Sequence, residues 1–324
     1  MHDRRSFSQD RLAALSEELE PVRDILDSNG LCVYATGSYG RLEAGPDSDI
    51  DLFFLHDAGR DVEFPYTELV LVMARLIEAA KDLGFPPFTR HGRFLTVQSV
   101  ATVEEVLGSP EDDSLNAFTA RLLLLLESRP VSDERPYRGL LERVLCFYYR
   151  DFEDHAEDFV PVFLLNDILR FWRTLTLNYE HHRLKILQLA GAERERKKAD
   201  SALKNYKLKV SRLTTCFSMA AHLGSSPVPV TLDEVLRLCE LTPRERLAEL
   251  GASNASAADV VRQLEERYVA FLDVTQRPEA EAVDQFLDPD ERKRALDEAR
   301  GYGDLIFELV TLVCPPERMR YFVV

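Results

Sequence analysis

The sequence of 324 residues lacks any run of about eighteen consecutive apolar residues, the length that a membrane-spanning helix needs. Its N-terminus, "MHDRRSFSQD", also lacks the apolar core of a secretory signal peptide. These two absences argue against insertion in a membrane and against secretion. We therefore expect a cytoplasmic protein without a membrane partner.

Paired cysteines are missing as well. None of the cysteines belongs to a CxxC pair, their number is odd, and they are scattered along the chain at Cys32, Cys146, Cys216, Cys239 and Cys314. This spacing predicts neither a zinc site nor a disulfide framework. We expect reduced thiols in or near the core.

Positive charge is scarce. The chain has 40 Lys and Arg residues and 56 Asp and Glu residues, which gives a formal net charge of -16. Long nucleic acids are normally bound by a basic face, so the composition argues against extended nucleic-acid binding. A nucleotide is not excluded, since a metal ion can bridge acidic side chains and phosphates. One segment departs from the average: residues 183–212 hold ten Lys and Arg against three Asp and Glu.

The sequence pattern changes along the chain and predicts an α+β protein of two domains. Apolar residues recur at helical spacing over residues 8–29 and 66–83, whereas residues 31–36, 49–55 and 93–100 are typical of strands. From about residue 114 onward the pattern is helical, with a Pro- and Ser-rich break at 224–231. We expect a small α/β domain with an N-terminal helix over 1–107, followed by an all-helical domain over 108–324.

The stretch "YATGSYGRLEAGPDSDIDLFFL" (34–55) carries the clearest chemistry. Asp49 and Asp51 would share one face of a strand while Ile50 points into the core, and two such carboxylates repel one another unless a cation lies between them. Oxygen ligands suit Mg²⁺, which binds one or two carboxylates together with substrate phosphates. Gly37 and Ser38 follow a strand directly, where free backbone N–H groups and a hydroxyl can hold a phosphate. The combination predicts a site for a metal-bound nucleoside triphosphate.

"GSYGRLEAGPDSDIDLFFL" resembles the core signature of the polymerase-beta-like nucleotidyltransferase superfamily. The "YGRLEAG" and "SDIDL" segments are most similar to the branch of nitrogen-regulation uridylyltransferases and small bacterial nucleotidyltransferases. The resemblance implies a mixed sheet with helices on one side and a two-metal transfer of a nucleoside monophosphate. It assigns Gly37 and Ser38 to the β and γ phosphates, and Asp49 and Asp51 to two Mg²⁺ ions, with Mn²⁺ as an alternative.

The sequence departs from the superfamily pattern at one place. A third carboxylate usually comes from a later strand and helps to activate the attacking hydroxyl, but the candidate strand "RFLTVQSV" offers Thr96 and Gln98 instead. Glu63 and Glu104 are the alternatives nearby. The missing acid leaves open a degenerate enzyme, or an enzyme whose partner or acceptor supplies the base.

The helical half offers further candidates for nucleotide binding. Arg170 and Asn178 belong to a polar stripe on an apolar helix, and Lys204 and Lys207 belong to the basic segment. These residues either face solvent or form the second wall of a cleft that holds the nucleotide. Arg41, Lys204 or Lys207 would offset the charge of the leaving pyrophosphate, whereas residues 194–198 are expected in an exposed loop or helix end.

Three functions fit these patterns. The leading hypothesis is a Mg²⁺-dependent nucleotidyltransferase that transfers a nucleoside monophosphate from a nucleoside triphosphate, such as ATP, to a hydroxyl of a protein or other macromolecule. The first alternative is a nucleotide second-messenger synthase, which would make a small cyclic or linear oligonucleotide. The second alternative is a nucleotide-sensing or antitoxin-like module that keeps the fold without turnover.

Overall fold

The computed structural model describes residues 2–57, 64–88 and 95–323. Its packing divides the chain into two compact units. Unit 1 comprises Met1–Asp154 and Leu232–Thr242, and unit 2 comprises His155–Thr231 and Pro243–Val324. The domain boundary expected after residue 107 stays a prediction, although the packing of unit 1 continues beyond it.

The N-terminal helical segment is interrupted at Pro21. The sequence predicts one helix over 8–29, but the structure has α1 (His2–Glu18), a 3-10 turn η1 (Glu20–Val22) and α2 (Arg23–Ser28). Pro21 lies in the first turn of η1, where a missing backbone N–H is tolerated, whereas the interior of a helix would lose a hydrogen bond there. The prediction of a single helix was therefore wrong at this position.

A four-stranded mixed sheet forms the centre of unit 1, in the order β3-β2-β1-β4. β1 (Leu31–Thr36) runs antiparallel to β2 (Asp51–His56) and to β4 (Arg129–Pro130), whereas β2 runs parallel to β3 (Val97–Ser99). The three predicted strands are confirmed, with β2 beginning at Asp51 and β3 reduced to three residues. Residues 93 and 94 of the third expected strand lie outside the described residues. The sheet and the helices after it confirm the α+β class.

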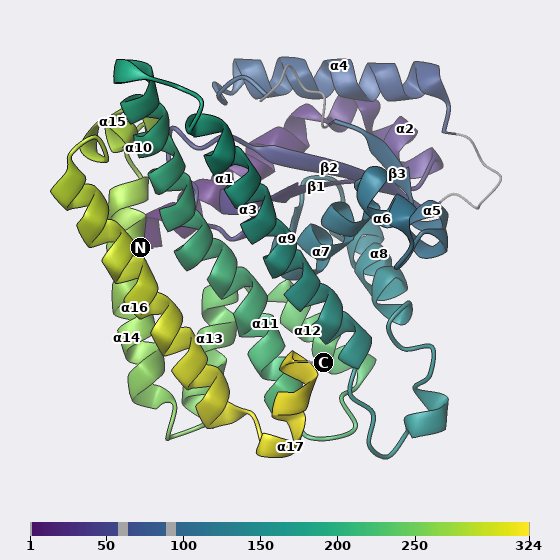
Figure 1. Ribbon diagram of the computed structural model, residues 1–324. Helices are drawn as coiled ribbons and strands as arrows, with labels where there is room; N and C mark the ends of the chain where they lie inside the picture. Colours follow the sequence, from purple (N-terminus) through teal and green to yellow (C-terminus); the bar gives the residue numbers. More distant parts are fainter. Residues whose placement is uncertain (1, 58–63, 89–94, 324) are drawn as a thin grey trace. The chain divides into compact units, whose positions relative to one another are not determined.

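Helices cover both faces of this sheet. On one face Leu52 and Phe54 share a core cluster with residues of α1, α2 and α4 (Tyr66–Asp82). On the other face Tyr34 stacks on Phe53, and its hydroxyl donates a hydrogen bond to the carbonyl of Ala120 at 3.3 Å. Ala120 belongs to α7 (Ala117–Glu127), so α4 and α7 lie on opposite sides of β1 and β2 (Figure 1). The expectation of helices on one side only was wrong.

Helix α7 is buried along most of its length, which explains its continuous apolar sequence. Its one arginine, Arg121, is held by a bidentate ion pair with Asp112, with nitrogen–oxygen distances of 2.8 and 2.9 Å. Arg121 Nε also donates to the Tyr148 hydroxyl at 2.7 Å. A charge enclosed in this way needs such partners, because an unpaired buried charge is strongly destabilising.

The remaining elements of unit 1 are α5 (Val100–Glu105), α6 (Pro110–Ser114), α8 (Glu134–Cys146) and α12 (Leu232–Glu240). α12 comes from a later part of the chain and packs against α8. The chain first passes from unit 1 to unit 2 within the 3-10 turn η3 (Glu153–His155). The break expected at 224–231 coincides with the loop that leads back from unit 2 to α12.

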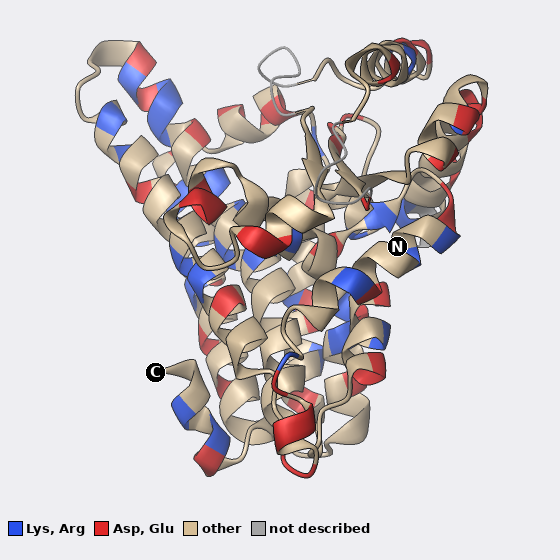
Figure 2. Ribbon diagram, turned by 90° about the vertical axis from the view of Figure 1, so that its right-hand side faces the viewer, with Lys and Arg blue, Asp and Glu red and all other residues tan. Residues whose placement is uncertain are grey.

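Unit 2 is helical throughout its regular elements. These are α9 (Val162–Ile186), α10 (Gly191–Lys207), the π-helical segment η4 (Leu208–Arg212), α11 (Leu213–Ser225), α13 (Pro243–Ser253), α14 (Ala258–Thr275), α15 (Glu279–Gln285), α16 (Pro289–Val313), α17 (Pro316–Met319) and the 3-10 turn η5 (Arg320–Phe322). Their core includes Tyr206, Tyr268 and Tyr302. Acidic and basic residues are interspersed along the helices of the molecule (Figure 2).

Two expectations from composition can be compared with this fold. Within the described ranges, no helix combines the length and the apolar character that a bilayer span requires. Four of the cysteines are buried free thiols, as expected, and Cys146 is exposed.

Candidate active site

The turn after β1 is built around two glycines. Gly37 opens the one-turn helix α3 (Gly37–Gly40) with a φ of +67°, a conformation that favours glycine. A Cβ atom at Gly37 would lie 3.1 Å from Asp51 Oδ2, and one at Gly40 would lie 1.9 Å from the carbonyl oxygen of Glu127. The backbone can therefore approach both the Asp51 carboxylate and the end of α7 because neither position carries a side chain.

Asp49 and Asp51 alternate with buried apolar residues, as the sequence predicts. Both side chains are exposed, while Ile50 and Leu52 belong to the buried cluster beneath α1 and α4. Asp51 is the first residue of β2 and pairs in register with Thr36, the last residue of β1. The alternation of exposed acids and buried apolar residues is confirmed, and Asp49 lies just before the strand.

The register of the two strands brings the Gly37 turn to the Asp51 carboxylate. Ser38 is half-buried, and its carbonyl oxygen accepts a hydrogen bond from the backbone N–H of Glu43 at 2.8 Å. The backbone N–H of Arg41 likewise donates to the carbonyl of Gly37 at 3.0 Å. These bonds fix a tight turn beside a carboxylate that is open to solvent.

Arg41 has carboxylate partners that the sequence did not reveal. Its Nη1 donates to Glu127 Oε2 at 2.8 Å, and its Nε donates to Glu43 Oε2 at 2.9 Å. The Arg41 side chain is only 10% exposed. Glu43 lies two residues away and could have been suspected, but no local signal points to Glu127, 86 residues later. The geometry makes Arg41 a link between the Gly37 turn and α7, and its contact with nucleotide stays a prediction.

Tyr39, which belongs to the Gly37 turn, is buried in the core of unit 1. Burial raises the pKa of its hydroxyl, a hydrogen bond from Arg11 lowers the pKa, and the nearby Asp49 carboxylate raises it. The Arg11 guanidinium lies 4.0 Å from the centre of the Phe85 ring and donates to the carbonyl of Leu83 at 2.5 Å. Sequence reasoning missed Arg11 because Leu83 and Phe85 lie on a distant segment of the chain, although the guanidinium also lies 6.0 Å from the ring centre of nearby Phe7.

The third carboxylate of the superfamily pattern is not found at the described residues. No group of three or more His, Cys, Asp and Glu side chains in the ranges 2–57, 64–88 and 95–323 is placed to hold a metal ion. Glu104 pairs with Arg150 at 3.2 Å, and the Gln98 amide donates to the carbonyl of Leu115 at 3.0 Å. Glu63 lies outside the described residues.

The candidates from the helical half all lie in unit 2. Arg170 and Asn178 are on α9, where Arg170 lies 3.7 Å from the carboxylate of Asp167 and Asn178 is exposed. Lys204 and Lys207 are in the last turn of α10. A cleft shared by these residues and the aspartates of unit 1 stays a prediction.

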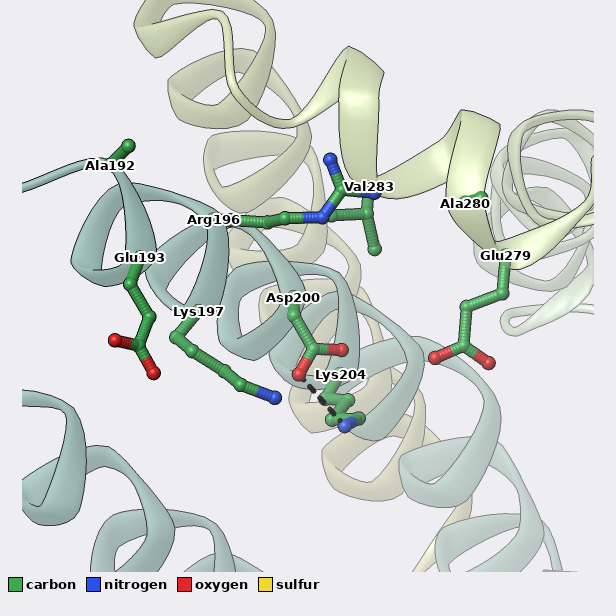
Figure 3. Close-up of a pocket in the computed structure, with 9 residues that line it drawn as sticks. All are labelled: Ala192, Glu193, Arg196, Lys197, Asp200, Lys204, Glu279, Ala280 and Val283. Atoms are coloured by element: carbon green, nitrogen blue, oxygen red, sulfur yellow. Dashed lines mark hydrogen bonds and ion pairs between the residues drawn. The ribbon is translucent and has the colours of Figure 1, made fainter.

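Lys204 lines a pocket of about 590 Å³ between α10 and α15. Its ammonium lies 3.0 Å from Asp200, and Lys197 extends into the same pocket (Figure 3). Lys207 is not among the residues that line it. Residues 194–198 are exposed, as expected, and lie near the beginning of α10 rather than in a loop. Lys197 lines the same pocket as Lys204, and the expected difference between them in nucleotide binding stays a prediction.

Comparison with known families agrees with this local architecture. Residues 19–93 match the family model described as "Nucleotidyltransferase domain". The match covers α2, β1, the Gly37 turn, the aspartates and α4. No curated protein matches the sequence.

The chain thus contains a nucleotidyltransferase domain, consistent with the polymerase-beta-like superfamily. Such a domain implies a nucleoside triphosphate substrate and supports transfer of a nucleoside monophosphate as the general reaction.

Proposed function

We propose that this protein is a Mg²⁺-dependent nucleotidyltransferase that transfers a nucleoside monophosphate to a hydroxyl of a protein or other macromolecule. The observation that carries the proposal is the approach of the Gly37 backbone to the Asp51 carboxylate, where even a Cβ atom would lie only 3.1 Å from Oδ2. Such proximity would put backbone N–H donors for a phosphate beside a ligand for the metal that the phosphate carries.

The donor set fits Mg²⁺. Asp49 and Asp51 are exposed and offer hard oxygen ligands, and Mg²⁺ is usually bound by one or two carboxylates, with phosphates and water completing its octahedron. The bound ions would polarise the phosphate and lower the pKa of the attacking hydroxyl. A site built this way does not require three protein carboxylates to bind the nucleotide.

In the proposed reaction, the acceptor oxygen forms a bond to the α-phosphorus and the bond to pyrophosphate breaks. The Gly37 and Ser38 turn would hold the β and γ phosphates, so that the leaving group is fixed in line with the acceptor. The hydroxyl proton would pass to solvent or to a base on the acceptor, because the described part of the chain offers no third carboxylate beside the aspartates.

That missing carboxylate also supports a second candidate, a nucleotide-sensing or antitoxin-like module that binds nucleoside triphosphate without turnover. The two candidates share the same binding site and differ in pyrophosphate release. A nucleotide second-messenger synthase would differ from both in its product.

The test is incubation of the full-length chain with each α-labelled nucleoside triphosphate, Mg²⁺ or Mn²⁺, and a cell extract as the source of acceptors. Pyrophosphate release with label on a macromolecule supports the proposal, whereas a labelled small oligonucleotide indicates a second-messenger synthase. Binding without pyrophosphate release indicates the sensing module.

The matched control is the double variant Asp49→Asn with Asp51→Asn. We expect it to lose Mg²⁺-dependent binding of nucleoside triphosphate while its thermal stability is unchanged or raised, since two like charges are removed. Unchanged affinity for the nucleotide in this variant would contradict the proposed site.

A further inference from the structure

Helix α4 presents an apolar face to solvent. Tyr66, Val70 and Ile77 are 76%, 47% and 47% exposed, and Met73 between them is half-buried, with part of its side chain packed against the core of unit 1. At about 100° per residue these four side chains lie within an arc of ~60° on the helix surface. Leu71, which is 56% exposed, lies outside this stripe and widens the apolar surface of the helix. The side of α4 that carries Val72, Leu76 and Ala79 is buried in the core of unit 1.

The exposed face also carries no charge over three turns. Glu68 and Arg75 are the charged residues between positions 66 and 77, and both bind groups of unit 1. Asn29 donates to the Glu68 carboxylate at 2.6 Å, and Arg75 Nε donates to the carbonyl of Glu18 at 2.7 Å. A solvated helix face is normally charged, and 30% of the residues in this chain are charged. An uncharged apolar stripe of this length is typical of an interaction surface.

The spacing of the stripe indicates which partner fits it. Tyr66, Val70, Met73 and Ile77 follow one another at intervals of four, three and four residues, as in a coiled-coil seam. This order of intervals is the same in both directions along the helix. In an antiparallel pair of α4 helices, each apolar residue of one stripe therefore faces an apolar residue of the other. Tyr66 faces Ile77 and Val70 faces Met73, and each of these pairs occurs twice about a two-fold axis.

We propose that the protein forms a homodimer through an antiparallel pair of α4 helices. Thr67 and Ala74 flank the stripe on one side, and such small side chains allow the two helices to approach closely. An uncharged interface matters in a protein of net charge -16, because two copies repel each other and the contact itself must not add to the repulsion. The inference rests on α4 alone and is independent of the proposed enzymatic function.

The expected association is weak. The stripe spans eleven residue steps, or ~16 Å of helix, so the buried area falls below the ~1,200 Å² that is common in stable complexes. We expect a dissociation constant of roughly micromolar order. Added salt should strengthen the dimer, because it screens the repulsion between the acidic protomers without weakening apolar contacts.

The experiment is sedimentation velocity on the full-length chain over a concentration series up to several hundred micromolar. Tyr66→Lys and Ile77→Glu are each expected to weaken dimerisation at least tenfold, because each puts an unpaired charge opposite an apolar residue. Both positions are strongly exposed, so the fold should tolerate the changes. In a mixture of the two variants, the antiparallel register places the new lysine opposite the new glutamate, and dimerisation should return as a heterodimer.

Leu177→Glu is the control, since Leu177 is 70% exposed on α9 and outside the stripe. It should leave dimerisation unchanged. A wild-type chain that stays monomeric over the whole series would overturn the proposal, as would a dimer that survives both single variants. Failure of the mixture to restore association would overturn the antiparallel pairing.

Discussion

Gly37 and Gly84 have similar left-handed backbone conformations, with φ angles of +67° and +73°, but different surroundings. A Cβ atom at Gly84 would meet nothing within 4 Å, whereas one at Gly37 would press on the Asp51 carboxylate. Both Gly→Ala changes should therefore cost about 1–2 kcal/mol of stability through backbone strain. Only Gly37→Ala should also displace Asp51.

We expect Gly37→Ala to weaken Mg²⁺-dependent binding of nucleoside triphosphate by about tenfold or more, or ~1.4 kcal/mol. Gly84→Ala should leave binding unchanged. Isothermal titration calorimetry on the two variants measures the difference at a temperature where both are folded. Equal affinities would mean that the contact between the turn and Asp51 does not serve binding.

Ser38 allows a more specific prediction, because its hydroxyl would contact the terminal phosphates and not the nucleoside. Ser38→Ala should weaken binding of the triphosphate by roughly 1.5–3 kcal/mol, the contribution of a hydrogen bond to a charged group. Binding of the corresponding monophosphate should change far less. Competition titrations with both ligands test this, and equal losses would indicate a turn with a structural role only.

At the scale of elements, the Gly37 turn is tied to the end of α7 through Arg41. Glu127→Gln would remove the charge from a fully buried partner of Arg41, so we expect a loss of about 1–3 kcal/mol in the free energy of unfolding. Glu104→Gln is the control, since its ion pair with Arg150 is exposed and should contribute only ~0–1 kcal/mol. Urea unfolding measures both.

If the link to α7 positions the turn, Glu127→Gln should also weaken binding of the triphosphate more than of the monophosphate. A purely structural role would lower the unfolding free energy and leave that ratio unchanged. Glu104→Gln should leave that ratio unchanged and lower the unfolding free energy by no more than ~1 kcal/mol, because α5 is not part of the turn.

The elements themselves could be predicted where local signals are strong. β1 was expected at its observed bounds, and the helix closed by Gly84 was expected within a residue, because apolar periodicity and the terminal glycine act locally. The break at Pro21 was missed, since helical periodicity continues on both sides of it. The covering of the second sheet face by α7 was missed because it depends on contacts between segments about 86 residues apart.

At the scale of the whole molecule, the buried thiols predict how stability depends on pH. Burial raises the pKa of Cys32, Cys216 and Cys314 to about 12 each, from a usual value of 9.0. In the unfolded chain these thiols ionise near that usual value. The stability that they contribute is therefore complete below that pH and is lost as pH rises toward 12.

We expect the free energy of unfolding to fall above pH 9 by up to ~1.4 kcal/mol per pH unit for each thiol. Urea unfolding at pH 8, 9 and 10 measures this slope. A variant with Cys32, Cys216 and Cys314 replaced by alanine should show a smaller slope, although its stability at pH 8 is lower. A flat profile for the wild type between pH 9 and 10 would contradict the prediction.

The net charge of the whole chain explains why the sequence alone argues against one class of partner, long nucleic acids, but does not identify another. A net charge of -16 argues against long nucleic acids, and no tertiary contact can change that sum. Whether a given Lys or Arg side chain can bind a phosphate depends on the residues around that side chain. Lys204 shows this, since Asp200 lies 3.0 Å from its ammonium and lowers the positive charge available to a ligand.

The sequence by itself determined the nucleotidyltransferase signature, the strand that carries it and the alternation of Asp49 and Asp51 with buried residues. These features are local, because side chains alternate along a strand and a glycine is needed wherever φ is positive. Only the tertiary structure decided that Gly37 lies against Asp51, that Arg41 binds Glu127, and that Glu68 and Arg75 leave the stripe on α4 uncharged between Tyr66 and Ile77. Each of these depends on the register of β1 with β2 or on packing between distant helices, which the free energy of the whole fold sets and no short stretch of sequence encodes.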